Sequence, residues 1–78
     1  MKKILILGGS HRDIPLIEAS KELGYFVITL GDRSYYLGHN YSDKYYKVNF
    51  NDLIKVKEII KSEGIDYLLP GSGEESYI

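Results

Sequence analysis

Two short loops rich in glycine carry the residues best suited to hold a small molecule. The residues concerned are Gly8, Gly9, Ser10 and His11 in the first loop, and Gly71, Ser72, Gly73 and Glu74 in the second. Backbone amides of such loops can approach a phosphate or carboxylate closely, because glycine has no Cβ. The two loops are therefore the predicted binding site for a small substrate that carries a phosphate or carboxylate, and the equal alternative is that their glycines only permit tight strand-to-helix turns.

Asp32 is a third candidate for ligand contact, since it ends an apolar run at the place where a ribose-binding acid would lie. An acid at this place is equally a common turn residue. Residues 8–13 lack the glycine spacing G-x-G-x-x-G of dinucleotide-binding loops, and the sequence has no Gly-Lys-Ser or Gly-Lys-Thr. Neither a dinucleotide fingerprint nor a Walker loop is therefore indicated.

The sequence offers no set of metal ligands and no catalytic group. Its two histidines, His11 and His39, fall in separate loops, and it has no cysteine. His11 stands beside the glycine pair and could contact an anion, although a solvated loop histidine is the alternative. We expect no metal site, no cofactor and no catalytic residue in these residues.

Charge and hydropathy exclude two classes of partner. The formal net charge is −1 and the pI is about 6.1, so we expect no nucleic-acid surface. Eight tyrosines could stack on bases, but without a basic groove we expect them to pack the loop of residues 34–46 onto the sheet or to meet another domain. No apolar run is long enough for a membrane span or a signal peptide, which predicts a cytoplasmic protein.

Alternating apolar runs and helical patterns predict an α/β fold. The predicted strands are residues 4–7, 25–30, 45–48 and 65–69, and the predicted helices are residues 14–23 and 52–63. Strand–helix–strand units of this length imply parallel strands with right-handed crossovers. We therefore expect a Rossmann-like open parallel sheet of about four strands in the order 3-2-1-4, with helices on both faces and residues 45–48 at an edge. Both glycine loops would then lie at the carboxyl edge of the sheet, beside the switch point where ligands bind.

Local signals set the expected helix limits. Pro15 should push Ile14 away from helical angles, so that residues 11–13 form an extra turn whose side chains reach into the crevice. Asn49 or Asn51 should cap the second helix. Gly24 and Gly64 should end the two helices. Periodicity predicts one apolar face on each helix. The first has Ile14, Ile17 and Leu23 with Ala19 and Ser20 beside them, and the second has Leu53, Val56 and Ile60 flanked by Ile59.

The last residues have the pattern of a helix start. Gly73 to Ile78 includes two acids where the positive end of a helix dipole would favour them, yet the sequence stops within two turns. We expect residues 1–78 to be one domain taken from a longer protein.

The order of these motifs resembles the pre-ATP-grasp domain at the front of ATP-grasp ligases, such as biotin carboxylase, carbamoyl phosphate synthetase-like proteins and the purine-pathway enzymes. The resemblance is carried by residues 3–10, 19–25, 41–44 and 69–74. It implies that ATP and Mg²⁺ bind to downstream ATP-grasp domains of the same chain, while this lobe holds the acceptor substrate and is not an enzyme alone. It also implies that Gly8, Gly9 and Ser10 contact a substrate phosphate, although Ser10 replaces the third glycine of the purine enzymes.

Two other functions remain open from the sequence. One is a free-standing nucleotide-sensing module with a Rossmann-like fold, in which Asp32 would bind the ribose. The other is a structural module that forms a homodimer through exposed tyrosines or an unfinished sheet edge.

Overall fold

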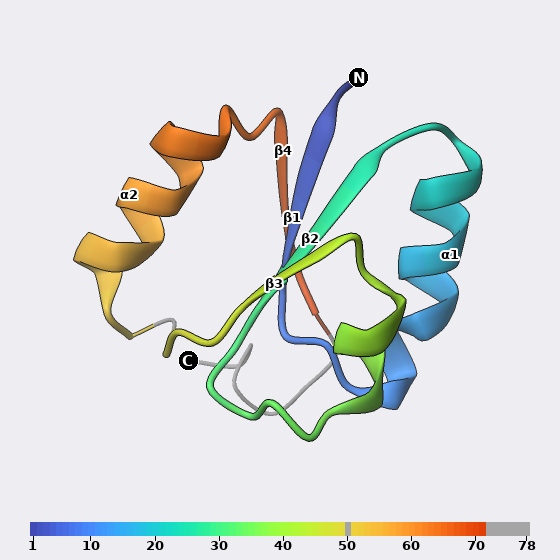
Figure 1. The fold of residues 1–78 in the computed structure, drawn as a ribbon, viewed down its shortest axis with the longest axis horizontal. Coiled ribbons are helices and arrows are strands. Elements are labelled where there is room, and N and C mark those ends of the chain that lie inside the picture. Colours follow the sequence, from blue (N-terminus) through green and yellow to red (C-terminus); the bar gives the residue numbers. More distant parts are fainter. Residues whose placement is uncertain (50, 72–78) are drawn as a thin grey trace.

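In a computed structural model, the chain forms one four-stranded parallel sheet (Figure 1). The structure describes residues 1–49 and 51–71. The strands are β1 (Lys3–Leu7), β2 (Phe26–Leu30), β3 (Lys44–Tyr46) and β4 (Tyr67–Pro70), and their order is β3-β2-β1-β4. The helices are α1 (Ile14–Glu22) and α2 (Leu53–Glu63), with short 3₁₀ turns η1 (His11–Asp13) and η2 (Leu37–Tyr41). The predicted α/β class, strand order and parallel pairing are confirmed.

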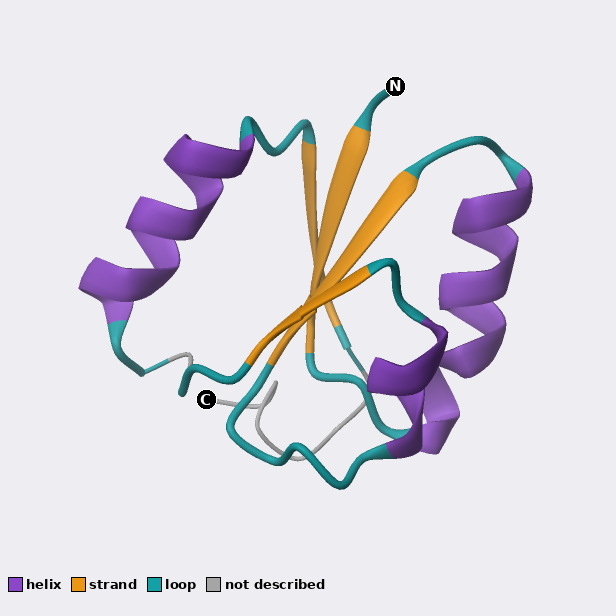
Figure 2. Cartoon of the chain, in the orientation of Figure 1, coloured by secondary structure: helices purple, strands orange, loops and turns teal. Residues whose placement is uncertain are grey.

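The two helices cover opposite faces of the sheet, as Figure 2 shows. Successive β1 side chains alternate between two cores because neighbouring strand residues point to opposite faces. Leu5 packs with residues of β2 and with Val56 and Ile59 of α2, whereas Ile4 and Ile6 pack with Ile17 of α1. Burial on both faces is the physical reason for the continuous apolar run in β1.

The strand limits differ from the predicted ones mainly at β3 and β4. The β3 strand ends at Tyr46 rather than at residue 48, and its position at the sheet edge is confirmed. The β4 strand begins at Tyr67 rather than at residue 65, because Ile65 still donates its amide hydrogen to Ile60 of the preceding helix. Asp66 then holds the start of β1, accepting from the Lys3 amide at 2.8 Å.

The first helix begins one residue before its proline. Ile14 has helical angles (φ −55°, ψ −47°), so the prediction that Pro15 displaces it was wrong. Proline is tolerated in the first turn because its missing N–H has no partner there in any case. The extra turn is confirmed as η1. Leu23 is 75% exposed rather than buried, since α1 ends at Glu22.

The second helix has a different cap from those predicted, whereas its predicted apolar face is confirmed except at Leu53, with Ile60 packed against the core. Its N-cap is Asp52, whose carboxylate accepts from the Lys55 amide at 3.3 Å. Asn49 and Asn51 pair instead with each other in the preceding turn, at 2.8 Å. Val56 and Ile59 are buried, but Leu53 is 63% exposed. Gly64 ends the helix in the left-handed region (φ 66°), as predicted.

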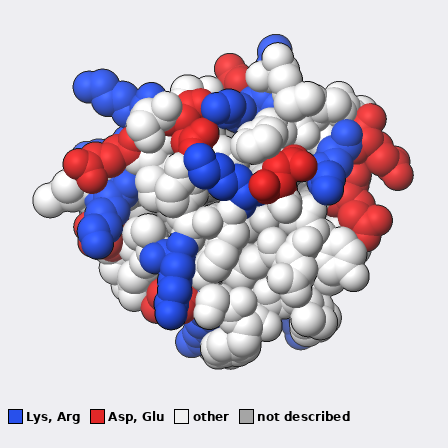
Figure 3. All heavy atoms as spheres, viewed as in Figure 1, with Lys and Arg blue, Asp and Glu red and all other residues white. Residues whose placement is uncertain are grey.

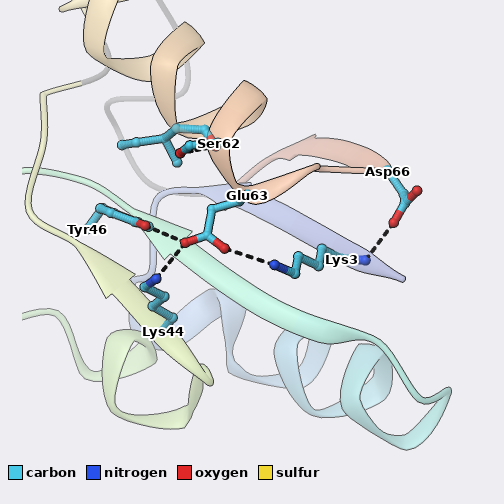
Figure 4. Close-up of polar contacts among 7 residues, drawn as sticks. Lys3, Lys44, Tyr46, Ser62, Glu63 and Asp66 are labelled. Carbon is cyan, nitrogen blue, oxygen red and sulfur yellow. Dashed lines mark hydrogen bonds and ion pairs between the residues drawn. The ribbon is translucent and has the colours of Figure 1, made fainter. Parts of the chain in front are cut away.

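An ionic cluster fastens the end of α2 to the sheet (Figure 4). The Glu63 carboxylate pairs with Lys3 of β1 at 3.0 Å and with Lys44 of β3 at 2.6 Å, and it also accepts from the Tyr46 hydroxyl. The hydrogen bond from Lys44, followed by those from Tyr46 and Lys3, lowers the pKa of Glu63 to about 2. The hydrogen bond between Lys44 and Glu63 also raises the pKa of Lys44.

Charges of both signs alternate over the upper and lateral parts of the face in Figure 3, and its lower part is largely uncharged. Comparison with Figure 1 places the carboxyl ends of the strands toward that lower part. Among the residues that the structure describes, no helix is long and apolar enough to span a membrane.

Candidate functional site

The first glycine loop meets Gly71, the first residue of the second loop, at the carboxyl edge of the sheet. Because β1 and β4 are parallel neighbours, Gly8 and Gly71 follow the two strands side by side. The Gly71 amide donates to the Leu7 carbonyl at 2.6 Å, and a Cβ added to Gly8 would lie 3.5 Å from the Gly71 Cα. Gly71, the one residue of the second loop that the structure describes, therefore lies beside the first loop at the predicted edge.

The buried carboxylate of Asp13 lies at the junction of these loops. Its side chain comes from η1 and is only 2% exposed. The amides of Gly9 and Ser10 donate to the same oxygen, Oδ2, at 3.0 and 3.1 Å. A Cβ added to Gly71 would lie 2.8 Å from this oxygen. The amides expected to receive a ligand's oxyanion are thus bound to a carboxylate of the chain itself.

On its other side, the first glycine loop is covered by His39 from η2. A Cβ on Gly9 would lie 2.3 Å from the His39 Cε1 atom, so the imidazole packs directly on the glycine. The ring is fixed by a 2.8 Å hydrogen bond between its Nδ1 and the Thr29 hydroxyl and by stacking on Tyr45, with 3.9 Å between ring centroids. His39 therefore forms a rigid wall between the glycine loop and the end of β2.

The tyrosine-rich loop also packs against the carboxyl edge. Gly38 lies against the Gly9 carbonyl, and the Tyr45 hydroxyl donates to the Gly31 carbonyl at 2.7 Å. Burial, and then the Asp32 carboxylate, raise the pKa of the Tyr45 phenol. Tyr35 differs, being 73% exposed. The expectation that tyrosines pack this loop onto the sheet is confirmed for Tyr45.

The accessible side chains of the site are His11 and Asp32. Both are exposed, and Asp32 accepts a hydrogen bond from the Asn49 side chain at 3.2 Å. Gly71 is half-buried. An incoming molecule would meet an imidazole, a carboxylate and part of the second loop at this edge.

The remaining predicted residues are either buried or outside the described part of the chain. Gly8, Gly9 and Ser10 are buried. Ser72, Gly73 and Glu74, together with the helix start predicted at residues 73–78, lie outside the described residues. Within residues 1–49 and 51–71, no three histidine, aspartate or glutamate side chains are grouped as a metal site would require.

Sequence reasoning missed the roles of two residues. Asp13 was expected only as part of an extra turn, yet the spacing Ser10-x-x-Asp13 is that of a capping box, which would have placed its carboxylate on the Ser10 amide. His39 was treated as a loop histidine. Its contacts with Gly9 and Thr29 span thirty and ten residues, and no local pattern signals them.

No protein-family model and no curated protein matches the sequence. Solved structures do match. N5-carboxyaminoimidazole ribonucleotide synthetase from Thermotoga maritima has a TM-score of 0.79 and 25% identity, covering 91% of this chain. Glycinamide-RNase-transformylase T from Mycobacterium tuberculosis has a TM-score of 0.82 and 21% identity, also over 91%. Phosphoribosylglycinamide synthetase from Anaerococcus prevotii has a TM-score of 0.79 and 22% identity over 96%.

These neighbours are ATP-grasp ligases, and the part of each that matches is its N-terminal domain. The chain spans only 19–20% of their length. The strand order, the approach of Gly71 to the first glycine loop and these matches agree with the resemblance noted in the sequence: the chain has the fold of the pre-ATP-grasp domain of ATP-grasp ligases.

Proposed function

We propose that residues 1–78 are the substrate-side lobe of an ATP-dependent ligase whose ATP-binding and Mg²⁺-binding domains lie downstream in the same protein. The observation that carries the proposal is the match of nearly the whole chain to the N-terminal fifth of three ATP-grasp ligases. The lobe supplies no catalytic residue. It holds the acceptor substrate at the carboxyl edge of its sheet.

The reaction class follows from the same resemblance. An ATP-grasp ligase phosphorylates a carboxylate with ATP, and an amine or another nucleophile then displaces the phosphate. The names of two neighbours contain a ribonucleotide or a phosphoribosyl group, which favours a phosphate-bearing acceptor for this chain as well. We assign contact with the anionic group to His11 and hydrogen bonding with hydroxyl groups to Asp32, an assignment supported by the exposure of both side chains.

Calorimetric titration of the chain separates this function from a nucleotide-binding one. We expect saturable binding of ribose 5-phosphate that His11→Ala weakens, and no binding of ATP. Lys57→Ala is the control, because Lys57 is exposed on α2, away from the carboxyl edge. Saturable binding of ATP by these residues alone would contradict the proposal. The longer protein should hydrolyse ATP in the presence of its acceptor.

The nucleotide-sensing alternative is favoured by one observation, the exposed carboxylate of Asp32 directly beyond β2. It predicts binding of NADH, ADP or AMP that is lost in Asp32→Ala. The occupied amides of Gly9 and Ser10 count against it, because dinucleotide-binding loops use such amides for the pyrophosphate.

A further inference from the structure

We propose that Asp13 is the positioning residue of the first glycine loop, and that its carboxylate takes the place of a ligand's oxyanion at the Gly9 and Ser10 amides. The part of this inference that concerns substrate binding rests on the proposed function. It assigns the substrate's phosphate or carboxylate to the outer part of the carboxyl edge, beside His11, rather than to the glycine amides.

The first step is the geometry at Asp13. Two successive backbone amides converge on one carboxylate oxygen at 3.0 and 3.1 Å, which is how loops bind phosphate and carboxylate ligands. The acceptor is charged, so each hydrogen bond is stronger than one between neutral groups. The glycine loop is thus an anion-binding loop that is filled by a side chain four residues further along.

The second step is enclosure. The Oδ2 atom would lie 3.3 Å from a Cβ on Gly8 and 2.8 Å from a Cβ on Gly71, so both loops close on the carboxylate through glycines. Asp13 is 2% exposed, and Gly9 and Ser10 are buried as well, so the carboxylate and both amides lie below the surface. A side chain at position 71 would have to displace either this carboxylate or the Leu7 carbonyl, 2.5 Å from the same Cβ.

The third step concerns charge. A second anion at these amides would meet the Asp13 carboxylate at contact distance in a buried site, where like charges repel strongly. The chain therefore excludes a phosphate from this position as long as Asp13 stays in place. The exposed side chains of η1 that can donate to an anion are His11, directly after Ser10, and Arg12 beside it.

Amide NMR of the chain tests the assignment. Titration with inorganic phosphate and with ribose 5-phosphate should shift the resonances of His11 but leave the Gly9 and Ser10 amides unchanged. In Asp13→Ala, hydrogen exchange at these two amides should accelerate by about tenfold or more, because each loses its acceptor. Added formate should reverse the acceleration with saturation, by filling the vacated position.

A purely structural role for Asp13 would give no rescue by formate, and that result in a folded Asp13→Ala variant would overturn the proposal. Asp13→Asn keeps the shape and one acceptor oxygen. If Asp13→Ala does not fold, Asp13→Asn should still move both amide resonances, and unchanged resonances would overturn the assignment. Glu18→Ala is the matched control, since Glu18 is an exposed acid on α1.

The two proposals can fail separately. Saturable shifts of the wild-type Gly9 and Ser10 amides with phosphate would overturn the role of Asp13 and leave the substrate-side lobe intact. If ribose 5-phosphate shifts no resonance while both amides depend on Asp13, the role of Asp13 stands and the substrate-side lobe fails.

Discussion

Replacing Gly9 with alanine tests whether the glycine loop and the tyrosine-rich loop are locked together. The new Cβ would lie 2.3 Å from Cε1 and 2.4 Å from Nδ1 of His39. Ordinary contact begins at 3.4 Å, so the ring or the loop must move by about 1 Å. The ring cannot move freely, because Tyr45 stacks on it and Thr29 holds its Nδ1.

The expected cost has two parts. Gly9 has φ +150°, a value that costs a residue with a Cβ about 1–3 kcal/mol. Overpacking against His39 adds about 1–3 kcal/mol. Gly64→Ala is the matched control, because Gly64 also has positive φ (+66°) but nothing within 4 Å of its Cβ, so it should lose only about 1–2 kcal/mol.

Urea denaturation followed by circular dichroism measures both losses. For a domain of this size, each kcal/mol lost from the free energy of unfolding lowers Tm by about 4–8 °C. Thermal denaturation should therefore show Gly9→Ala lowering Tm by roughly 10 °C or more. In a His39→Ala background the new Cβ no longer clashes with the imidazole. The free energy of unfolding lost through Gly9→Ala should then be about 1–3 kcal/mol smaller than in the wild-type background. If Gly9→Ala and Gly64→Ala lose equal free energies of unfolding, and His39→Ala does not change the loss at Gly9, the two loops are not held together through His39 and the prediction is refuted.

Three further predictions concern the supporting elements. Glu63→Gln should destabilise the chain by about 1–2 kcal/mol at pH 7, a modest value because both lysines are partly exposed. Folding lowers the pKa of Glu63 from 4.5 to about 2, so its contribution is full above pH 4.5 and is lost as the pH falls toward 2; urea denaturation of wild type and variant should converge over this window. Val56→Ala should cost about 1–3 kcal/mol in the same assay and Leu53→Ala less than about 0.5 kcal/mol, because only Val56 is buried. Asp52→Ala should cost about 1 kcal/mol by removing the helix cap, and a larger loss for Asn51→Ala would contradict the cap assignment.

The topology was predictable because it depends on patterns that are local in sequence. The apolar run before Gly8 and the run before Gly31 are each buried on both faces, and one helical segment joins them. A strand, helix and strand so joined are nearly always parallel with a right-handed crossover. The order 3-2-1-4 was expected from the half-Rossmann pattern, and in that order Gly8 and Gly71 end neighbouring strands without knowledge of any side-chain contact.

Helix faces were less predictable, because periodicity shows which residues share a face but not how far the sheet extends beneath it. Leu53 lies on the predicted apolar face of α2, yet it is in the first turn and remains exposed, while Ile59 is buried. Leu23 was assigned to α1 but falls just beyond its end. In helices of nine and eleven residues, one misplaced terminal residue removes much of the predicted face.

The site shows a deeper limit of reading function from glycine. A glycine in a loop indicates that some atom approaches the backbone more closely than a Cβ would allow, but it does not identify that atom. From the sequence, the approaching group at Gly9 and Gly71 was taken to be a ligand. In the folded chain it is the imidazole of His39 at Gly9, and at Gly71 it is the Leu7 carbonyl together with the carboxylate of Asp13. The same close approach that binds a substrate's anion in other loops here joins two loops of one chain, which leaves the exposed side chains of the carboxyl edge to meet the substrate.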